Sequence, residues 1–216
     1  MHTKQTIAII GATGQMGTAL SESLAKAGYR LLLFSGNQER LKALESKIRS
    51  IYNSAEVDCA SCQHEACWEA DIIIPAIPYH AQEATAATIR DVATQKVVIS
   101  IINPFNKTFD GLETSNGTSA AEDLQQLLPH SHVVKAFNTN TAAAFPVAGS
   151  KQQPESFIAG DDAIAVAEVA AIVVAIGFRP VIVGGLSASR ALEEKALAML
   201  MDADQQNNKS KQLNHE

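Results

Sequence analysis

The sequence predicts an α/β fold: a doubly wound, mostly parallel sheet with a C-terminal βαβ extension and a final helix. Short apolar runs such as residues 6–10 alternate with amphipathic stretches of about 10–15 residues, which is typical of βαβ units. The runs are also apolar throughout, as expected of strands that helices cover on both faces.

The first half of the chain contains five predicted strands. The helix after the first strand carries Met16, Leu20 and Leu24 at spacings of four and stops at Gly28. The predicted strands are 6–10, 31–34, 57–60, 71–76 and 97–102, and the predicted helices are 15–27, 39–51 and 82–93.

The second half continues the alternation after a polar, turn-rich stretch, residues 105–117, which we expect to be a surface loop beside the strand ends. The elements predicted beyond it are strands 132–137, 155–159 and 179–183 and helices 119–128, 162–176 and 187–201. We expect residues 1–201 to form one domain, with the extension packed on the sheet. The polar residues 202–216 are expected to be a disordered tail.

Composition excludes several classes of protein. Of 216 residues, 46% are hydrophobic and 19% charged, which supports a large core and excludes wholesale disorder. The net charge of −6 argues against general nucleic-acid binding. The sequence has neither an apolar run of the roughly 20 residues that a bilayer requires nor a signal-peptide pattern at its start. Three cysteines cannot form a disulfide framework, so we expect a reduced, cytoplasmic protein.

The strongest local signal is a glycine loop between the first strand and the first helix. Its spacing is G-x-x-G-x-x-G, which lets the backbone turn tightly and leaves the N–H groups at the helix start facing a diphosphate. The alternative is a glycine turn that serves packing only, which the strand–loop–helix context makes much less favoured. The candidate cofactor-binding residues of this loop are Gly11, Thr13, Gly14, Gln15, Met16 and Gly17.

The choice of cofactor is expected at the end of the second strand. NAD-binding proteins place Asp or Glu there, about 20 residues after the glycines, to bind the ribose 2′-hydroxyl. Here no carboxylate lies at the strand tip, whereas Ser35 and Asn37 can donate hydrogen bonds and Arg40 can supply charge. This favours the 2′-phosphate of NADP(H). The alternative for Arg40 is a solvated helix residue.

Further motifs follow in a fixed order along the chain. Together with the glycine loop, they resemble the NADPH-dependent deazaflavin (coenzyme F-four-twenty) reductase family. They are also similar to the cytosolic reductase domain of the six-transmembrane metalloreductases, and the resemblance covers about residues 6–197. The motifs are Asn103-Pro104 and residues 119–122, 133–139, 160–162, 177–180 and 184–193.

The resemblance implies a Rossmann-like domain that transfers hydride between NADP(H) and a flavin-like, deazaflavin or ferric-chelate acceptor. It implies that Thr13, Gly14, Gln15 and Met16 hold the diphosphate, while Ser35 and Arg40 contact the 2′-phosphate. Two departures stand out: Gly36 occupies a position where the family often has Arg, and the chain turns polar after Met201. The remaining implied contacts are Ala76, Ile77 and Pro78 beside the adenosine and ribose, and Asn103, Pro104, Ala136, Asn138 and Thr139 around the nicotinamide.

The sequence assigns no catalytic residue. Hydride transfer between stacked rings depends on holding them close and aligned, so no elaborate catalytic set is required. A carbonyl or imine substrate would need an acid, for which Lys135 or His80 are candidates. The alternatives are a strand-end lysine that ties a loop and a loop-edge histidine. A second functional class, an NADP(H)-binding redox sensor without turnover, also remains open.

A cysteine-rich stretch holds Cys59, Cys62, His64 and Cys67. Structural zinc sites draw their ligand pairs from two separated segments, so we expect neither a metal site nor a redox dithiol here.

We expect a homodimer that pairs through the final helix, because that helix has an apolar edge. The residues of that edge are Leu192, Leu197, Leu200 and Met201.

Overall fold

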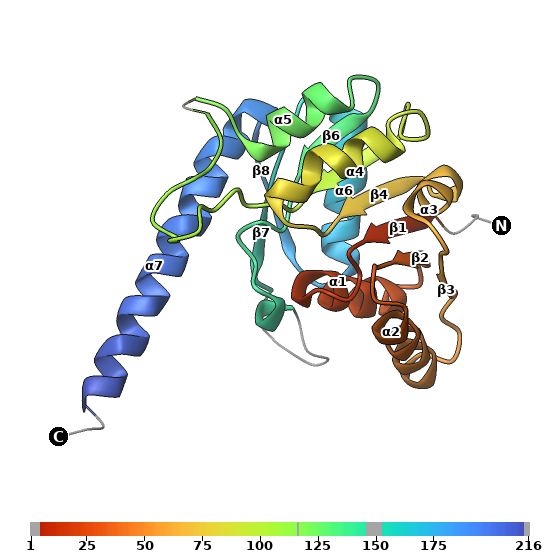
Figure 1. Ribbon diagram of the computed structural model, residues 1–216, viewed down its shortest axis with the longest axis horizontal. Helices are drawn as coiled ribbons and strands as arrows, with labels where there is room; N and C mark the ends of the chain where they lie inside the picture. The colour runs from red at the N-terminus through yellow and green to blue at the C-terminus, as the bar shows by residue number, and fades with distance from the viewer. Residues whose placement is uncertain (1–4, 116, 146–152, 214–216) are drawn as a thin grey trace.

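The computed structural model describes residues 5–115, 117–145 and 153–213, with side chains through Ala203. Its centre is an eight-stranded sheet of order β3-β2-β1-β4-β5-β6-β7-β8 (Figure 1). Every neighbouring pair is parallel except β6 and β7, which are antiparallel. The predicted doubly wound, mostly parallel sheet with its βαβ extension is therefore confirmed.

The elements follow the predicted alternation, although α4 ends at Ile89 where the prediction extended the helix to residue 93. The strands are β1 (Thr6–Ile10), β2 (Arg30–Phe34), β3 (Val57–Cys59), β4 (Ile72–Pro75), β5 (Val97–Ser100), β6 (His132–Lys135), β7 (Glu155–Gly160) and β8 (Arg179–Gly184). The helices are α1 (Gln15–Lys26), α2 (Gln38–Ile51), α3 (Gln63–Glu69), α4 (Gln82–Ile89), α5 (Ala120–Leu127), α6 (Ala163–Ala175) and α7 (Ser189–Leu213), with 3₁₀ turns η1 (Tyr79–Ala81), η2 (Ala142–Ala144) and η3 (Leu186–Ala188).

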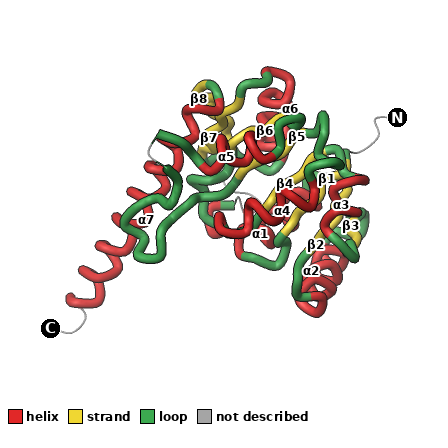
Figure 2. The backbone as a smooth tube through the Cα atoms, turned by 45° about the horizontal axis from the view of Figure 1, so that its top comes forward, coloured by secondary structure: helices red, strands yellow, loops and turns green. Residues whose placement is uncertain are grey.

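Helices cover both faces of the sheet, which explains why its strands are apolar throughout (Figure 2). One buried apolar cluster joins α1, α2 and α6 to one face, and a second joins α3, α4 and α5 to the other. All five residues of β1, which lies between the layers, are buried.

The strand order reverses at β1. The chain runs outward from β1 through β2 to β3 and then returns to β4 on the other side of β1. Ligands of doubly wound sheets bind at the carboxyl ends of the strands where the order reverses. The carboxyl ends of β1 and β4 are therefore the expected place for a dinucleotide.

Strands β5 and β6 end earlier than the sequence predicts. The prediction extended them to residues 102 and 137, but the ladders stop at Ser100 and Lys135. Beyond β6, Phe137 has φ +59°, which no strand residue adopts. Ile101, Ile102, Ala136 and Phe137 are nevertheless buried, and apolar composition alone cannot distinguish a buried loop from a strand.

Helix α7 differs most from the prediction. Its backbone continues to Leu213, where a disordered tail from residue 202 was expected, and it projects away from the sheet (Figure 1). Residues 202–213 contain neither glycine nor proline, so a helix that already exists can propagate through them. The prediction for residues 214–216 lies outside the described residues. Within the described ranges, no helix is both long and apolar enough to cross a membrane.

Candidate dinucleotide site

The glycine loop ties the ends of three strands together. Gly11 follows β1 with φ +86°, and its N–H and that of Ala12 donate to the Phe34 carbonyl at the end of β2, at 2.9 and 3.0 Å. A Cβ on Gly11 would lie 2.3 Å from the Ala76 carbonyl oxygen, just after β4. Only glycine satisfies both the positive φ and this close approach.

The start of α1 offers N–H groups for an anion. Gly14 is the N-cap in an extended conformation and provides no side-chain hydrogen bond to the first turn. The first N–H groups of a helix have no intrahelical acceptors, and the helix dipole is positive there. The Gly14 N–H already donates to the Gly11 carbonyl at 3.1 Å, but Gln15, the first residue of α1, is exposed, so a diphosphate can reach the start of the helix.

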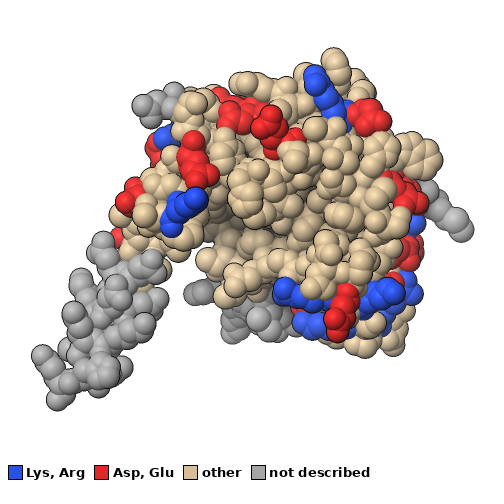
Figure 3. Space-filling model, in the orientation of Figure 1, with Lys and Arg blue, Asp and Glu red and all other residues tan. Residues whose placement is uncertain are grey.

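Four side chains gather between this loop and the start of α2. The hydroxyls of Thr13 and Ser35 lie 2.6 Å apart, and the Arg40 guanidinium donates to the Thr13 carbonyl at 3.3 Å. Asn37 caps α2, because its Oδ1 accepts from the Arg40 N–H at 2.9 Å. The structure therefore brings together Thr13, Ser35, Asn37 and Arg40, and Lys and Arg side chains gather over α2 (Figure 3).

The remaining candidate residues follow β4, β5 and β6 at the same edge of the sheet. Ala76 continues β4 and donates its N–H to the Ile10 carbonyl at 2.7 Å, which holds the 76–78 turn beside the glycine loop. Asn103 and Asn138 join the next two loops: Asn103 Nδ2 donates to the Asn138 carbonyl at 2.8 Å, and Asn138 Nδ2 donates to Asn103 Oδ1 at 3.0 Å. Asn138 Nδ2 also donates to the Leu192 carbonyl of α7 at 2.9 Å.

A buried ion pair supports these two loops. Lys135 Nζ lies 2.6 Å from Glu193 Oε1, and both side chains are fully buried. Lys135 also donates to the Ile102 carbonyl at 2.5 Å, and Glu193 Oε2 accepts from the Ala120 N–H at 3.2 Å. The pair thus connects β6, the loop after β5, the start of α5 and α7.

Burial opposes the charge of both partners. It lowers the pKa of Lys135 and raises the pKa of Glu193, and in each case the opposite charge of the other partner acts in the reverse direction. With no exposed atoms, Lys135 cannot reach a substrate as an acid. Its geometry is that of a strand-end lysine that ties a loop. His80, the other candidate acid, lies exposed in η1.

The sequence alone assigns no role to Glu193 or Arg190, which both shape the site. Arg190 ties the loop after β5 to α7, because it donates to Thr114 Oγ1 at 2.8 Å and to the Thr118 carbonyl at 3.0 Å. A signal for Glu193 did exist. It falls at helical spacing among the apolar or small residues that α7 buries, namely Ser189, Leu192 and Ala196.

The cysteine-rich stretch points its side chains to separate partners. Cys59 donates to Glu45, Cys62 caps α3 through the Glu65 N–H, and His64 pairs with Asp91. In the described part of the chain, no group of three or more His, Cys, Asp or Glu side chains is arranged to hold a metal ion.

The three thiols are expected to differ in reactivity. Burial is the largest cause that raises the pKa of Cys59 and of Cys67, each to about 12, whereas Cys62 is exposed. Only thiolates react rapidly with iodoacetamide. Peptide mass mapping after brief treatment at about pH 8 should therefore find Cys62 modified well before the other two. Equal labelling of all three under native conditions would contradict the structure.

The strand order and the helices on both faces of the sheet are those of a Rossmann-like nucleotide-binding domain. Residues 6–104 match the family described as "NADP oxidoreductase coenzyme F420-dependent". The family resemblance predicted from the sequence is confirmed, and the protein is an NADP-dependent oxidoreductase.

Individual proteins that are similar to this chain include reductases of the same kind. The F420-dependent NADP reductase of Methanothermobacter thermautotrophicus is 28% identical over 197 residues, which are 87% of this chain and 84% of that protein. Metalloreductase STEAP3 of Rattus norvegicus is 25% identical over 90% of this chain but only 37% of its own length. A crystal structure from Arthrobacter sp. FB24 has a TM-score of 0.78 at 23% identity and covers 92% of each chain, which supports the fold.

Proposed function

We propose that this protein binds NADPH across the carboxyl ends of β1 and β4 and transfers hydride to a flavin-like, deazaflavin or ferric-chelate acceptor. The observation that carries the proposal is the cluster of Thr13, Ser35 and Arg40 beside the uncapped start of α1. Hydroxyl and guanidinium donors suit the 2′-phosphate, and a carboxylate that would suit a free 2′-hydroxyl is absent from residues 34–38.

The adjoining residues fit the rest of the dinucleotide. The first turn of α1, with Gln15 and Met16, faces the diphosphate, and the 76–78 turn lines the adenosine and ribose. The loops that carry Asn103–Pro104 and Ala136–Thr139 border the nicotinamide. Among the described residues, Asn138 Oδ1 is a buried acceptor without a partner, which suits the amide N–H of the nicotinamide.

The chain's contribution to the reaction is positioning. The bound nicotinamide supplies the hydride, so the protein needs to hold two rings close and aligned. The Lys135–Glu193 pair and the Asn103–Asn138 pair fix the two loops that would set this alignment. Phe137 between them has positive φ and is fully buried, a strained conformation that the surrounding packing must enforce.

The experiment that tests this function measures NADPH oxidation under anaerobic conditions. The readout is the loss of NADPH absorbance. The acceptors are a deazaflavin, riboflavin, FMN and ferric citrate, each added separately. Oxidation that depends on at least one acceptor supports the proposal. Tight NADPH binding without oxidation by any of them favours the second candidate, a redox sensor that binds NADP(H) without turnover.

Removal of the Arg40 guanidinium should weaken NADPH binding selectively. A charge-assisted hydrogen bond is worth about 1.5–3 kcal/mol, so Arg40→Ala should raise the Kd for NADPH about tenfold to a hundredfold. The Kd for NADH, which lacks the phosphate, should change little. Lys47→Ala, which removes a charge near the other end of α2 where Lys47 pairs with Glu22, is the matched control and should leave both constants nearly unchanged. Equal losses for NADPH and NADH in Arg40→Ala would refute the assignment.

We also propose a homodimer that pairs through α7. Leu192 is buried against the body and cannot take part, whereas Met201 is 42% exposed and Leu197 and Leu200 are half-buried. Size-exclusion chromatography with light scattering should therefore give twice the mass of the 23.0 kDa chain. A monomer mass would overturn this prediction.

Two broader expectations belong to the same proposal. We place the protein in the cytoplasm, which its three free cysteines support. We treat residues 1–201 as one NADP-binding domain, because β7 and β8 continue the same sheet as β1.

A further inference from the structure

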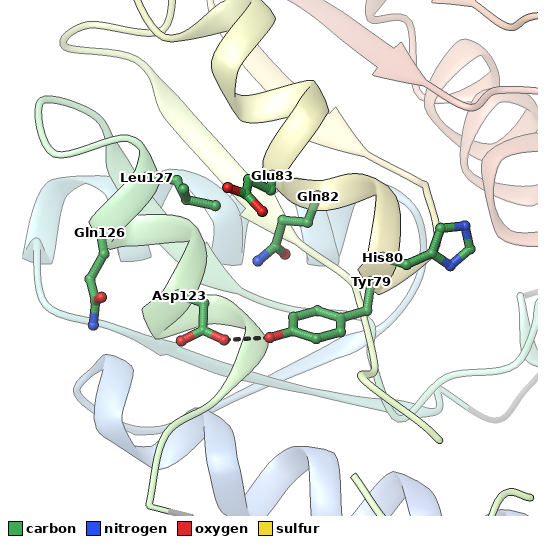
Figure 4. Close-up of a pocket in the computed structure, with 7 residues that line it drawn as sticks. All are labelled: Tyr79, His80, Gln82, Glu83, Asp123, Gln126 and Leu127. Atoms are coloured by element: carbon green, nitrogen blue, oxygen red, sulfur yellow. Dashed lines mark hydrogen bonds between the residues drawn. The ribbon is translucent and has the colours of Figure 1, made fainter. Parts of the chain in front are cut away.

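A pocket lies between the start of α4 and helix α5, on the face of the sheet that α3, α4 and α5 cover (Figure 4). Its volume is about 330 Å³, which lies within the range of small-molecule sites. Tyr79 of η1, Gln82 and Glu83 of α4, and Asp123 and Leu127 of α5 line it. The His80 ring points away from the other labelled residues.

Gln82 presents an unused acceptor to this pocket. The residue is only 2% exposed, and its Nε2 donates to the Ala120 carbonyl at 3.0 Å. Its Oε1 is buried and has no hydrogen-bond partner among the described residues. In Figure 4 the amide points into the space between α4 and α5. A buried acceptor without a partner is costly, so a ligand that donates a hydrogen bond there gains affinity.

The charged groups of the pocket are carboxylates. Asp123 accepts from the Tyr79 hydroxyl at 2.7 Å and from the Thr118 hydroxyl at 2.8 Å, so neighbouring residues orient it. Glu83 is exposed at the rim. No lysine or arginine is among the lining residues. We infer that this pocket binds the protonated amino group of a small organic molecule, with Gln82 Oε1 and the two carboxylates as its acceptors.

The residues present favour an ammonium group over other ligands. The described residues provide no cluster of three or more metal-ligating side chains here or elsewhere, which disfavours a divalent cation. Two carboxylates repel an anion, whereas an ammonium group brings three donors and a positive charge. Leu127 on the wall offers an apolar surface to the carbon chain that carries the amine.

The inference goes beyond the proposed function and is independent of it. The pocket begins past Pro78, and its lining residues include none of the candidate cofactor-binding residues. Both ligands should therefore bind at the same time.

The test titrates the full chain with n-butylammonium as the probe. Binding is measured as the change in chemical shift of the Gln82 side-chain amide in ¹H–¹⁵N spectra. n-Butanol, which has the same carbon chain without the charge, is the matched ligand. Glu83→Gln removes one pocket carboxylate from an exposed position, so the variant is expected to fold. Glu65→Gln on α3, exposed and outside this pocket, is the matched control variant.

We expect a saturable shift of the Gln82 amide with n-butylammonium and not with n-butanol. One exposed charge contact should weaken binding about threefold or more in Glu83→Gln, with no change in Glu65→Gln. The shift should persist when the protein is saturated with NADP⁺. The inference is overturned if the shift does not saturate, if n-butanol gives the same response, if Glu83→Gln binds as the parent does, or if NADP⁺ abolishes binding.

Discussion

Replacing Glu193 with alanine is expected to lower the free energy of unfolding by about 3–5 kcal/mol, because it leaves the Lys135 ammonium buried without its counter-charge. Both side chains are fully buried and lie 2.6 Å apart, so the structure offers Lys135 no other carboxylate partner in the described residues. The variant also frees the Ala120 N–H at the start of α5. Urea unfolding followed by circular dichroism measures the loss.

Two control variants test whether the loss of stability comes from the buried position of this ion pair. Glu22→Ala breaks the exposed pair with Lys47, and should cost less than about 1 kcal/mol. The double variant Lys135→Met, Glu193→Leu removes both charges and should be less destabilised than the sum of the single variants, because the orphaned charge is gone. If Glu193→Ala costs no more than Glu22→Ala, the pair does not hold the loops as described.

Replacing Gly17 with alanine is expected to disrupt the glycine loop. The new Cβ would lie 2.3 Å from the Gly11 carbonyl oxygen and within 3 Å of Ala12 backbone atoms, none of which can move as a flexible side chain could. The start of α1 must shift away from β1. We expect a loss of about 1–3 kcal/mol in the free energy of unfolding and a Kd for NADPH raised by about tenfold or more, since one misplaced turn forfeits several N–H contacts.

Gly36→Ala is the matched control for Gly17→Ala. It lies just after the end of β2, but a Cβ there meets nothing within 4 Å, so stability should stay nearly unchanged. Isothermal titration calorimetry with NADPH and urea unfolding of both variants make the comparison. Normal NADPH binding by Gly17→Ala would show that the close contact between α1 and the loop is not needed for the cofactor.

Most of the fold could be predicted because its sequence signals are local and consistent. The apolar runs at β1, β2 and β4 and the glycine loop each predict the same βαβ arrangement. The residues Thr13, Ser35 and Arg40 could be linked from the sequence alone, because the end of β2 must adjoin the loop after β1 in a parallel sheet.

The rest depends on contacts between residues far apart in the chain. Nothing near Lys135 reveals that its partner is Glu193, on a helix that begins many residues later. The ends of β5 and β6 were misplaced because Ile102 and Phe137 are as buried in loops as they would be in strands. The extent of α7 was missed because polar residues are compatible with both a helix and a disordered chain.

The most direct test of the central claim is a calorimetric titration of the protein with NADPH and, separately, with NADH. The donors of Thr13, Ser35 and Arg40 gathered beside the glycine loop predict binding that favours NADPH by about tenfold or more. Equal affinity for both, or binding of neither, would contradict an NADP site at the carboxyl ends of β1 and β4.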